Sequence, residues 1–393
     1  MNGLALDGVR IVDFSWQIAG PTCTRYLGAM GADVIRIESG RRPDPYRART
    51  ISYFINQSKK SITLNLSHPQ GIQLVKDLAS ISDVVVENFA PGVIERLGLS
   101  YEEFRSVRPE IVMLSSAGLG HSGPDMKHVA YGTLVQCFTG WSALQGYPDR
   151  EPELVSGIWT DPMVGIMEVF LINAAIHNAR QTGKGEYIDV SMAEATTMLL
   201  PEVILDYGMN QRTSDPLGNR DIHYAPQGNY PCIGQDEWIG ISIKDDLQWG
   251  SLCAVLDCSE LEKDLRFDTL EKRRLNHDDL DALLSKYTRD WDATDLMEAL
   301  QDKGVPAGNT QTVPQLNNNK HWEYRNFFQD YMEEDDDHTT HSLPVVPWRF
   351  DGEIEASVTG QPNRGQHNLA IFEDLLGLTE AEVEKLIEQE VIY

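Results

Sequence analysis

Short apolar runs recur along the first 120 residues, and amphipathic stretches separate them. The runs at 9–14, 32–38, 61–66, 83–89 and 110–116 are rich in Val, Ile and Leu, which is typical of strands buried on both faces. Residues 21–30, 68–80 and 91–107 instead carry apolar side chains at helical spacing, with a break in the last near Leu99. This alternation predicts an α/β fold with a doubly wound parallel sheet. Ligands of such sheets bind beyond the carboxyl ends of the strands.

The pattern changes in the second half of the chain. Residues 162–181 predict one long helix that Gly183 ends, and residues 228–243 predict a β-hairpin followed by helices to about residue 303. The C-terminal residues 369–392 are helical again and are expected to return to the first domain. We therefore predict a discontinuous large domain (1–205 and 325–393) and a smaller α+β domain (215–320), with linkers near 206–214 and 321–324.

Composition narrows the possible partners and location. The formal charge of −27 creates a field that repels nucleic acids and anionic membranes, so neither is expected as a partner. The longest apolar stretch, 163–176, contains Glu168 and is shorter than the about 20 residues of a membrane span. Five cysteines without ligand or CxxC spacing indicate free thiols in a reducing compartment. The N-terminus lacks a secretory pattern, and we expect a cytoplasmic protein.

Common catalytic and cofactor motifs do not explain the chain. The segment GLGHSG at 118–123 matches a dinucleotide fingerprint in its glycines. Such a fingerprint should open directly into a helix and be followed by an acidic residue about 20 positions later. Pro124 follows here instead, which favours a glycine-rich turn. The ten histidines are scattered, so no metal site is predicted.

Basic residues are scarce, and several of them fall near strand ends. They are Arg36, Arg41, Arg42, Arg47, Lys59, Lys60 and Arg96. In a chain of this charge the group could hold phosphates through charge-assisted hydrogen bonds. The alternative is a set of solvated surface charges paired with nearby acids, and the pattern alone leaves both interpretations open.

Asp161 stands at the start of the predicted long helix, in the segment WTDPMVG. An aspartate before proline is a common helix cap, because its carboxylate accepts the first free amides while Pro at the first helical position needs no partner. The same position suits catalysis, since a helix N-terminus favours an ionised carboxylate and such a carboxylate can attack an acyl carbon. The two roles do not exclude each other.

Longer segments, taken in order, resemble one family along nearly the whole chain. They are LDGVRIVDFSWQIAGPTCTRYLGAMGADVIRIE, NQSKKSITLNL, DVVVENFAPGVIERLGLSYEEFRSVRPEIVMLSSAGLGHSGP, YGTLVQCFTG, DPMVG with RQTGKGEYIDVSM, APQGNYPCIGQDEWIGIS, GVPAGNT and PNRGQHN. The chain resembles the class III CoA-transferases, a group that includes formyl-CoA and carnitine CoA-transferases. Each segment alone is weakly specific, but their order and spacing together make the resemblance strong.

The resemblance implies a Rossmann-like large domain, a smaller domain and a homodimer of interlocked rings. It implies transfer of CoA from an acyl-CoA donor to a carboxylic acid acceptor through a mixed anhydride and a thioester on Asp161. CoA would be a substrate, with no permanently bound cofactor. The implied CoA-binding residues are Gln17, Ile18, Leu64, Asn65, Leu66, Ser67, Asn88, Phe89, Ala90, Arg96, Tyr131 and Met192.

The chain also departs from the family pattern near the implied site. Ser39 replaces an arginine, so Arg41 or Arg42 is expected to bind CoA instead, and Ile18 replaces a glutamine. Val129 and Gly132 stand where formyl-CoA transferases have lysine and glutamate, and a glycine-rich active-site loop is missing. These differences weigh against formate and oxalate as substrates. Further candidates for the substrate pocket are Trp16, Trp159, His223 and Gly228.

Two alternatives remain beside CoA transfer. An α-methylacyl-CoA racemase would use a histidine base at the position of Tyr131, and a tyrosine with an ordinary pKa near 10 is a poor proton shuttle at neutral pH. A CoA-binding protein without catalytic activity would not need Asp161.

Overall fold

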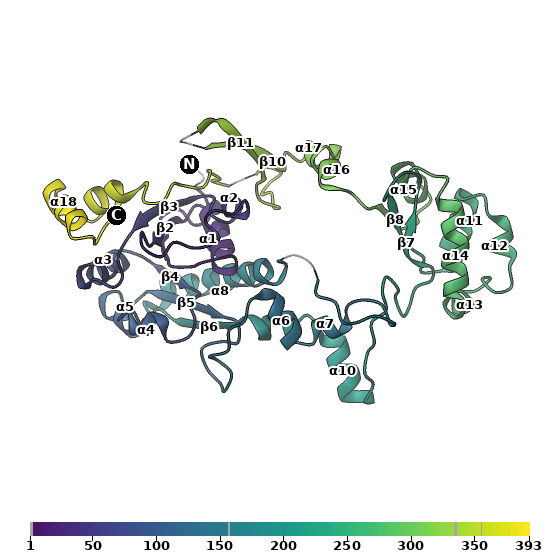
Figure 1. The fold of residues 1–393 in the computed structure, drawn as a ribbon, viewed down its shortest axis with the longest axis horizontal. Coiled ribbons are helices and arrows are strands. Elements are labelled where there is room, and N and C mark those ends of the chain that lie inside the picture. Colours follow the sequence, from purple (N-terminus) through teal and green to yellow (C-terminus); the bar gives the residue numbers. More distant parts are fainter. Residues whose placement is uncertain (1–2, 156–157, 334–335, 355) are drawn as a thin grey trace. The chain divides into compact units, whose positions relative to one another are not determined.

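The structure is a computed structural model that describes residues 3–155, 158–333, 336–354 and 356–393. The chain forms two compact units, which Figure 1 colours along the sequence. Unit 1 comprises Met1–Ser142, Leu154–Thr213 and Glu323–Tyr393, and unit 2 comprises Ala143–Glu153 and Ser214–Trp322. Residues 143–153 thus differ from the predicted division, which placed them in the large domain.

Hydrogen bonds explain why residues 143–153 group with unit 2. The Gly218 amide donates to the Gly146 carbonyl (2.8 Å), and the Asn219 side chain donates to the Tyr147 hydroxyl (3.0 Å). Gly218 has a φ of +62° and lies directly against the Tyr147 ring. These contacts join residues about 70 positions apart, and hydrophobic periodicity contains no signal for them.

Unit 1 is built on a six-stranded parallel sheet with the order β3-β2-β1-β4-β5-β6. Its strands are β1 (Arg10–Asp13), β2 (Asp33–Glu38), β3 (Lys59–Thr63), β4 (Val84–Glu87), β5 (Val112–Ala117) and β6 (Tyr187–Ser191). The predicted α/β fold with a parallel sheet is confirmed. The edge strand β6 was not predicted, although its segment YIDVS alternates polar and apolar residues as a half-buried strand does.

Helices cover both faces of this sheet, and alternate residues of each strand face opposite sides. Ile11 packs with α1 and α8 in one core cluster, whereas its neighbour Val12 packs with α3, α5 and α18 in a second cluster. The helices of unit 1 are α1 (Ala19–Ala29), α2 (Ile51–Ile55), α3 (Pro69–Ser80), α4 (Val93–Arg96), α5 (Tyr101–Val107), α6 (Gly132–Phe138), α8 (Thr160–Thr182), α9 (Met192–Thr197), α10 (Pro201–Asn210), the π-helix η1 (Ala370–Leu375) and α18 (Glu380–Glu388).

Helix α8 is the central helix of the first core cluster. Gly183 follows it with a φ of +69°, which confirms the predicted end of the helix. Gly165 lets α8 approach α1 closely, because a Cβ atom at this position would lie 2.6 Å from the Ala19 carbonyl oxygen. By length and composition alone α8 could cross a membrane. Its packing against α1 and the sheet accounts for the same apolar composition.

The C-terminal part of unit 1 adds a two-stranded hairpin and the final helices. Strands β10 (Phe328–Glu333) and β11 (Asp336–Pro344) pair antiparallel, and no strand was predicted there. The chain then returns to β3, where the Thr63 hydroxyl donates to the Tyr393 carbonyl (2.7 Å). The Asn65 amide donates to the Val391 carbonyl (2.9 Å).

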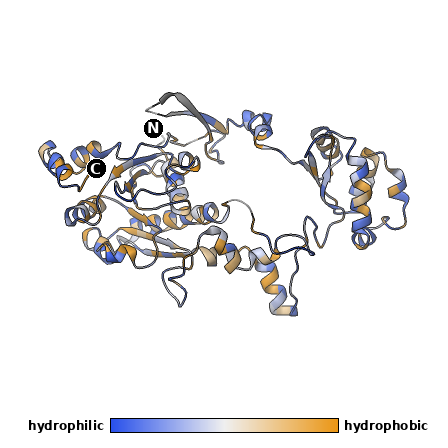
Figure 2. Ribbon diagram, in the orientation of Figure 1, coloured by the Kyte–Doolittle hydropathy of each residue, from blue (hydrophilic) through white to orange (hydrophobic). Residues whose placement is uncertain are grey.

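Unit 2 contains a three-stranded antiparallel sheet covered by helices. Its strands are β7 (Gln227–Pro231), β8 (Trp238–Ser242) and β9 (Ala307–Asn309), and β7 and β8 form the predicted hairpin. Helices such as α14 carry orange and blue residues side by side in Figure 2, as expected for one buried and one solvated face. The other helices are α11 (Asp246–Val255), α12 (Ser259–Lys263), α13 (Leu270–Leu275), α14 (His277–Thr288), α15 (Ala293–Gln301) and α16 (Val313–Asn317), with α7 (Trp141–Leu144) and α17 (Lys320–Tyr324) at the unit boundaries.

Candidate active site

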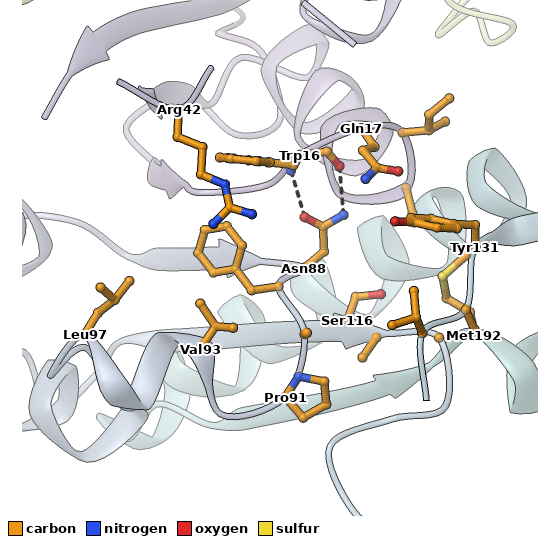
Figure 3. A pocket seen from close by; sticks show the side chains of 18 of the residues that line it. Trp16, Gln17, Arg42, Asn88, Pro91, Val93, Leu97, Ser116, Tyr131 and Met192 are labelled. Atoms are coloured by element: carbon orange, nitrogen blue, oxygen red, sulfur yellow. Dashed lines mark hydrogen bonds between the residues drawn. The ribbon is translucent and has the colours of Figure 1, made fainter. Parts of the chain in front are cut away.

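A cavity of about 540 Å³ opens in unit 1 at the carboxyl ends of the sheet strands (Figure 3). Its walls come from the segments that follow β1, β2, β3, β4 and β5 and from the starts of α8 and α9. The volume is within the range of small-molecule sites in proteins. The predicted site residues that line it are Trp16, Gln17, Ile18, Arg41, Arg42, Leu64, Asn65, Leu66, Ser67, Asn88, Phe89, Ala90, Tyr131, Asp161 and Met192.

Strands β1 and β4 are neighbours, and the loops that follow them meet at the cavity. The sheet order reverses between these strands, which is the usual ligand position in open α/β sheets. Asn88 joins the two loops, because its side-chain oxygen accepts from the Trp16 amide (2.7 Å) and its nitrogen donates to the Trp16 carbonyl (2.9 Å), as drawn in Figure 3. The Phe89 and Trp16 rings lie edge to face with centroids 6.0 Å apart.

Below the β1 loop lies a group of buried charges that we call the Asp13 cluster, composed of Asp13, Arg36, Asp44 and Lys59. Lys59 Nζ lies 3.1 Å from Asp13 Oδ2, and Arg36 Nη2 lies 2.7 Å from Asp44 Oδ2. Burial alone would raise the pKa of Asp13, but Lys59, Arg36 and two hydroxyl groups outweigh it and lower the pKa. Burial lowers the pKa of Lys59 to about 8. The cluster therefore keeps its charges in ion pairs.

The Asp13 cluster holds the β1 loop in an unusual conformation. Asp13 accepts from the Ser15 amide (2.8 Å), and Asp44 accepts from the Gln17 amide (3.1 Å). Gln17 has a φ of +60°, a left-handed conformation that costs energy for a residue other than glycine. The two carboxylates stabilise this conformation by binding the loop amides on either side of Trp16.

These ion pairs correct the idea that the basic group as a whole holds phosphates. Arg36 and Lys59 form ion pairs with Asp44 and Asp13 within the buried cluster, and Lys60 pairs with Asp33 (2.6 Å). Arg47 lies 3.5 Å from Glu38 and donates to the Pro362 carbonyl. Arg41, which pairs with Glu390, and Arg42 are the members of the group that line the cavity.

Asp161 lies in the first turn of α8 and lines the cavity. The interpretation of this residue as a helix cap is wrong: α8 begins at Thr160, so Asp161 is already inside the helix and Trp159 is the N-cap residue. No cap hydrogen bond forms there, and Pro162 stands at the third helical position rather than the first. The Thr160 hydroxyl donates to Asp161 Oδ2 (3.3 Å). The Asp161 carboxylate therefore does not cap the N-terminus of α8.

Gly132 explains how the Asp161 carboxylate fits against the neighbouring helix α6. A Cβ atom at position 132 would collide with Asp161 Oδ2 and with the Thr160 hydroxyl. The missing side chain therefore makes room for the carboxylate beside the cavity. Gly132, which stands where formyl-CoA transferases have a glutamate, is thus required by the position of the Asp161 carboxylate in this chain.

The environment of Asp161 favours a reactive carboxylate. Burial raises the pKa of Asp161, while hydrogen bonds from Thr160 and from its own backbone amide lower it by less. Burial therefore has a larger effect on the pKa of Asp161 than the helix N-terminus, which the sequence suggested would favour the ionised form. A carboxylate with less hydration is more basic and a better nucleophile than a fully solvated one.

Comparison with known proteins identifies the family. The sequence model described as "CoA-transferase family III" matches residues 6–368. The chain belongs to CoA-transferase family III. It is 30% identical to a succinyl-CoA–D-citramalate CoA-transferase of Chloroflexus aurantiacus over 401 residues, with 98% of each chain covered. It is 32% identical to an acetyl-CoA:oxalate CoA-transferase of Acetobacter aceti over 77% of this chain and 79% of that protein.

A solved structure supports the same assignment at the level of the fold. The crystal structure of a CAIB/BAIF family protein from Brucella suis superposes with a TM-score of 0.87 at 29% identity. The match covers 95% of this chain and 100% of that chain. The predicted membership in the class III CoA-transferases is confirmed.

Four site residues predicted for this CoA-transferase do not line the cavity. Arg96 is exposed on α4, although its neighbour Leu97 does line it. Trp159 packs against Trp141 with ring centroids 4.7 Å apart. His223 and Gly228 belong to unit 2, where His223 is exposed and Gly228 lies on β7 beside a separate hollow of about 450 Å³.

Other cavity residues of this CoA-transferase were missed by sequence reasoning. Ser116 lies at the end of β5, and Lys127 and His128 lie in the segment that follows it. The strand-end rule applied to β5 would have found Ser116. Lys127 had a weaker signal, since it is an isolated cation in a strongly acidic chain.

The glycine-rich segment after β5 is a turn, as predicted, and it holds the half-buried His121. His121 lies between two carboxylates, with Nδ1 3.1 Å from Asp189 and Nε2 3.5 Å from Glu87. Burial alone would lower the pKa of His121, but these carboxylates outweigh it and raise the pKa. Glu87 also accepts from the Phe89 amide (2.8 Å) and so braces a cavity loop. Within the described parts of the chain, no cluster of His, Cys, Asp or Glu could hold a metal ion.

Proposed function

We propose that this CoA-transferase moves CoA from an acyl-CoA thioester to a carboxylic acid through covalent intermediates on Asp161. The supporting observation is that Asp161 shares one cavity with the loops after β1, β3 and β4. In this proposal those loops bind CoA, and Arg41, Arg42 and Lys127 supply positive charge for its phosphates. CoA is a substrate, and no permanently bound cofactor is required.

The reaction proceeds in four balanced steps. The Asp161 carboxylate attacks the donor thioester carbonyl, which forms a mixed anhydride and releases the CoA thiolate. The thiolate attacks the Asp161 carbonyl, which forms an aspartyl-CoA thioester and releases the donor acid as a carboxylate. The acceptor carboxylate attacks the Asp161 carbonyl of this thioester, which forms a second mixed anhydride and again releases the thiolate. The thiolate then attacks the acceptor acyl carbon, which gives the new acyl-CoA and restores Asp161.

Trapping of the covalent intermediate tests this mechanism. Incubation with an acyl-CoA and hydroxylamine should convert Asp161 to a hydroxamate that peptide mass spectrometry locates. Asp161→Asn should abolish both the adduct and turnover, whereas Asp77→Asn on the exposed side of α3 should leave both unchanged. Turnover without an Asp161 adduct would contradict the mechanism. Retention of an α-deuterium label during turnover would exclude the racemase alternative.

Substrate choice is best tested as a matrix of donors and acceptors. The names of the relatives suggest starting with succinyl-CoA and acetyl-CoA as donors and with oxalate and citramalate as acceptors. Products are measured by mass spectrometry of the CoA thioesters. Failure of every carboxylate acceptor would contradict CoA transfer between acids.

We also propose that the enzyme is a homodimer of interlocked rings with a Rossmann-like large domain. Unit 1 exposes a set of large apolar side chains on α6, α8 and α10, namely Leu134, Phe138, Ile166, Phe170, Ile204, Leu205 and Met209. Exposed apolar surface of this kind indicates a protein interface. Light scattering should give twice the monomer mass, and mixed tagged and untagged dimers should exchange subunits only after unfolding.

A cytoplasmic location is part of the proposal. All five cysteines are free thiols, and Cys23, Cys232, Cys253 and Cys258 are buried. Thiols of this kind persist in a reducing compartment. Fractionation of cells that express a tagged chain tests the location, and recovery with membranes or outside the cell would contradict it.

A further inference from the structure

A second carboxyl group lies on the buried face of α8, below Asp161. Glu168 follows Asp161 by seven residues, which is nearly two helical turns and places both residues on the same side of the helix. The side chain has an exposed fraction of 0%. Neither carboxyl oxygen has a hydrogen-bond partner among the described residues. An ionised carboxylate in this environment would be very costly.

The surroundings of Glu168 connect it with the cavity. Ser116 lines the cavity at the end of β5, and its hydroxyl is close enough to the Glu168 carboxyl to lower the pKa of that group. The charged groups that act on Glu168 are Asp161 on its own helix and Asp13 on β1. The Glu168 charge also raises the pKa of the Cys23 thiol on α1. No cation pairs with Glu168 in the described parts of the chain, since Lys59 pairs with Asp13.

We propose that Glu168 is a positioning residue that acts as an uncharged acid beneath the active site of the proposed CoA transfer. While it carries its proton, Asp161 is the unpaired anion that the reactants meet. Ionisation of Glu168 would add a second negative charge to a site that must accept a carboxylate and a thiolate. The role therefore rests on the proposed function, and it concerns the charge of the site rather than contact with substrate.

The electrostatics of Glu168 place this change in a useful pH range. Burial raises the pKa of Glu168 to about 7, the Ser116 hydroxyl lowers it, and the Asp161 and Asp13 carboxylates raise it. The group is thus mainly protonated below neutral pH and mainly ionised in alkaline solution. The coupling is reciprocal, so removal of the Asp161 charge must lower the pKa of Glu168.

The pH dependence of kcat/KM tests the proposal. For the wild type we expect a fall of about tenfold or more between about pH 6.5 and pH 8.5, since the ionised form is the poorer catalyst. Glu168→Gln, which mimics the neutral acid, should remove this alkaline fall. Glu186→Gln, an exposed glutamate that contacts the far end of α8 through Asn178 (2.7 Å), should retain it.

Two outcomes of the pH measurements would overturn the proposal. An alkaline fall with the same midpoint in Glu168→Gln would overturn the proposal and would point to Lys59, whose pKa is lowered to about 8. A wild type without any fall in this range would also overturn it. A purely structural role would change the stability of Glu168→Gln and leave the shape of its pH profile intact.

Infrared spectroscopy gives a second test that does not depend on turnover. The carbonyl band of the protonated Glu168 carboxyl should appear in wild type minus Glu168→Gln difference spectra and vanish with a midpoint near pH 7. In Asp161→Asn this midpoint should move to lower pH. An unchanged midpoint would overturn the coupling even if Asp161 is trapped as a hydroxamate, whereas a shifted midpoint without trapping would reject only the covalent mechanism.

Discussion

Two buried polar groups beneath the cavity differ in how they bear the cost of burial. In the Asp13 cluster each charge faces an opposite charge, as in the Lys59–Asp13 pair at 3.1 Å with both side chains fully buried. Glu168 is equally buried but faces two carboxylates and no cation. The cluster therefore stays ionised and fixes the β1 loop, whereas Glu168 can avoid the cost only by keeping a proton.

The difference shows what each group contributes to the site. Paired charges define geometry, because Asp13 and Asp44 bind the amides of Ser15 and Gln17. The unpaired acid Glu168 instead controls the charge of the site, because its ionisation changes the electrostatic field at Asp161. The predictions that follow break one side of this comparison at a time.

Breaking the paired side should have the largest effect. Lys59→Met leaves the Asp13 carboxylate buried without its cation, and the loss of one partner of a buried ion pair costs about 3–5 kcal/mol. Denaturant unfolding monitored by circular dichroism measures this free energy. Lys60→Met is the matched control, since Lys60 is 44% exposed and pairs with Asp33. The control should lose at most about 1 kcal/mol, and equal losses in both variants would contradict the comparison.

Breaking the unpaired side should have the opposite sign. The pKa of Glu168 is raised from 4.5 to about 7 in the folded state, so its protonated form gives full stability below about pH 4.5 and this stability is lost as pH rises through about 7. Glu168→Gln has no such loss. It should be more stable than the wild type by about 3 kcal/mol at pH 8.5, with the difference absent near pH 4.5. Chemical unfolding at both pH values measures it, and a pH-independent difference would contradict the assignment.

The sequence predicts the sheet that surrounds the two buried groups, but it does not predict the groups themselves. The strands of the large sheet could be predicted because runs such as VRIVDF and DVVVENF are apolar over the length of a buried strand. The strand-end rule and the family resemblance then named many of the residues that line the cavity, and their binding of CoA stays a prediction. Both depend on local pattern and chain order, which the sequence contains directly.

The remaining features depend on tertiary register. The sequence left open whether Arg36 and Lys59 hold phosphates or pair with acids. Their pairing with Asp44 and Asp13 depends on how β1, β2, β3 and the loop after β2 come together. Glu168 looked only like an interruption of an apolar stretch, because its burial depends on what α8 packs against. The cap interpretation of Asp161 failed because the backbone turns into α8 one residue before it.

A smaller effect should come from the neutral link between the loops. Asn88→Ala removes both hydrogen bonds to Trp16 while leaving the Asp13 cluster intact. We expect the KM for the CoA thioester to rise about tenfold, which corresponds to about 1.4 kcal/mol, with little change in kcat. Asn88→Asp is the matched control, since it can still accept from the Trp16 amide but cannot donate to the carbonyl. Steady-state kinetics should rank it between wild type and Asn88→Ala.

The smallest effect should come from an exposed cation at the cavity rim. Arg42 carries the same charge as Lys59, but it is exposed and lies over the Trp16 ring at 5.8 Å rather than in a buried ion pair. Arg42→Gln should therefore leave stability unchanged and raise the KM for the CoA thioester by about threefold to fivefold. The increase should shrink at high salt, because exposed charges are screened over about 8 Å at physiological ionic strength. Arg49→Gln, which removes an exposed arginine over Tyr46, should change neither quantity. A salt-independent increase for Arg42→Gln would mean that Arg42 acts through packing on Trp16, and the contrast with Lys59 would then be one of burial alone.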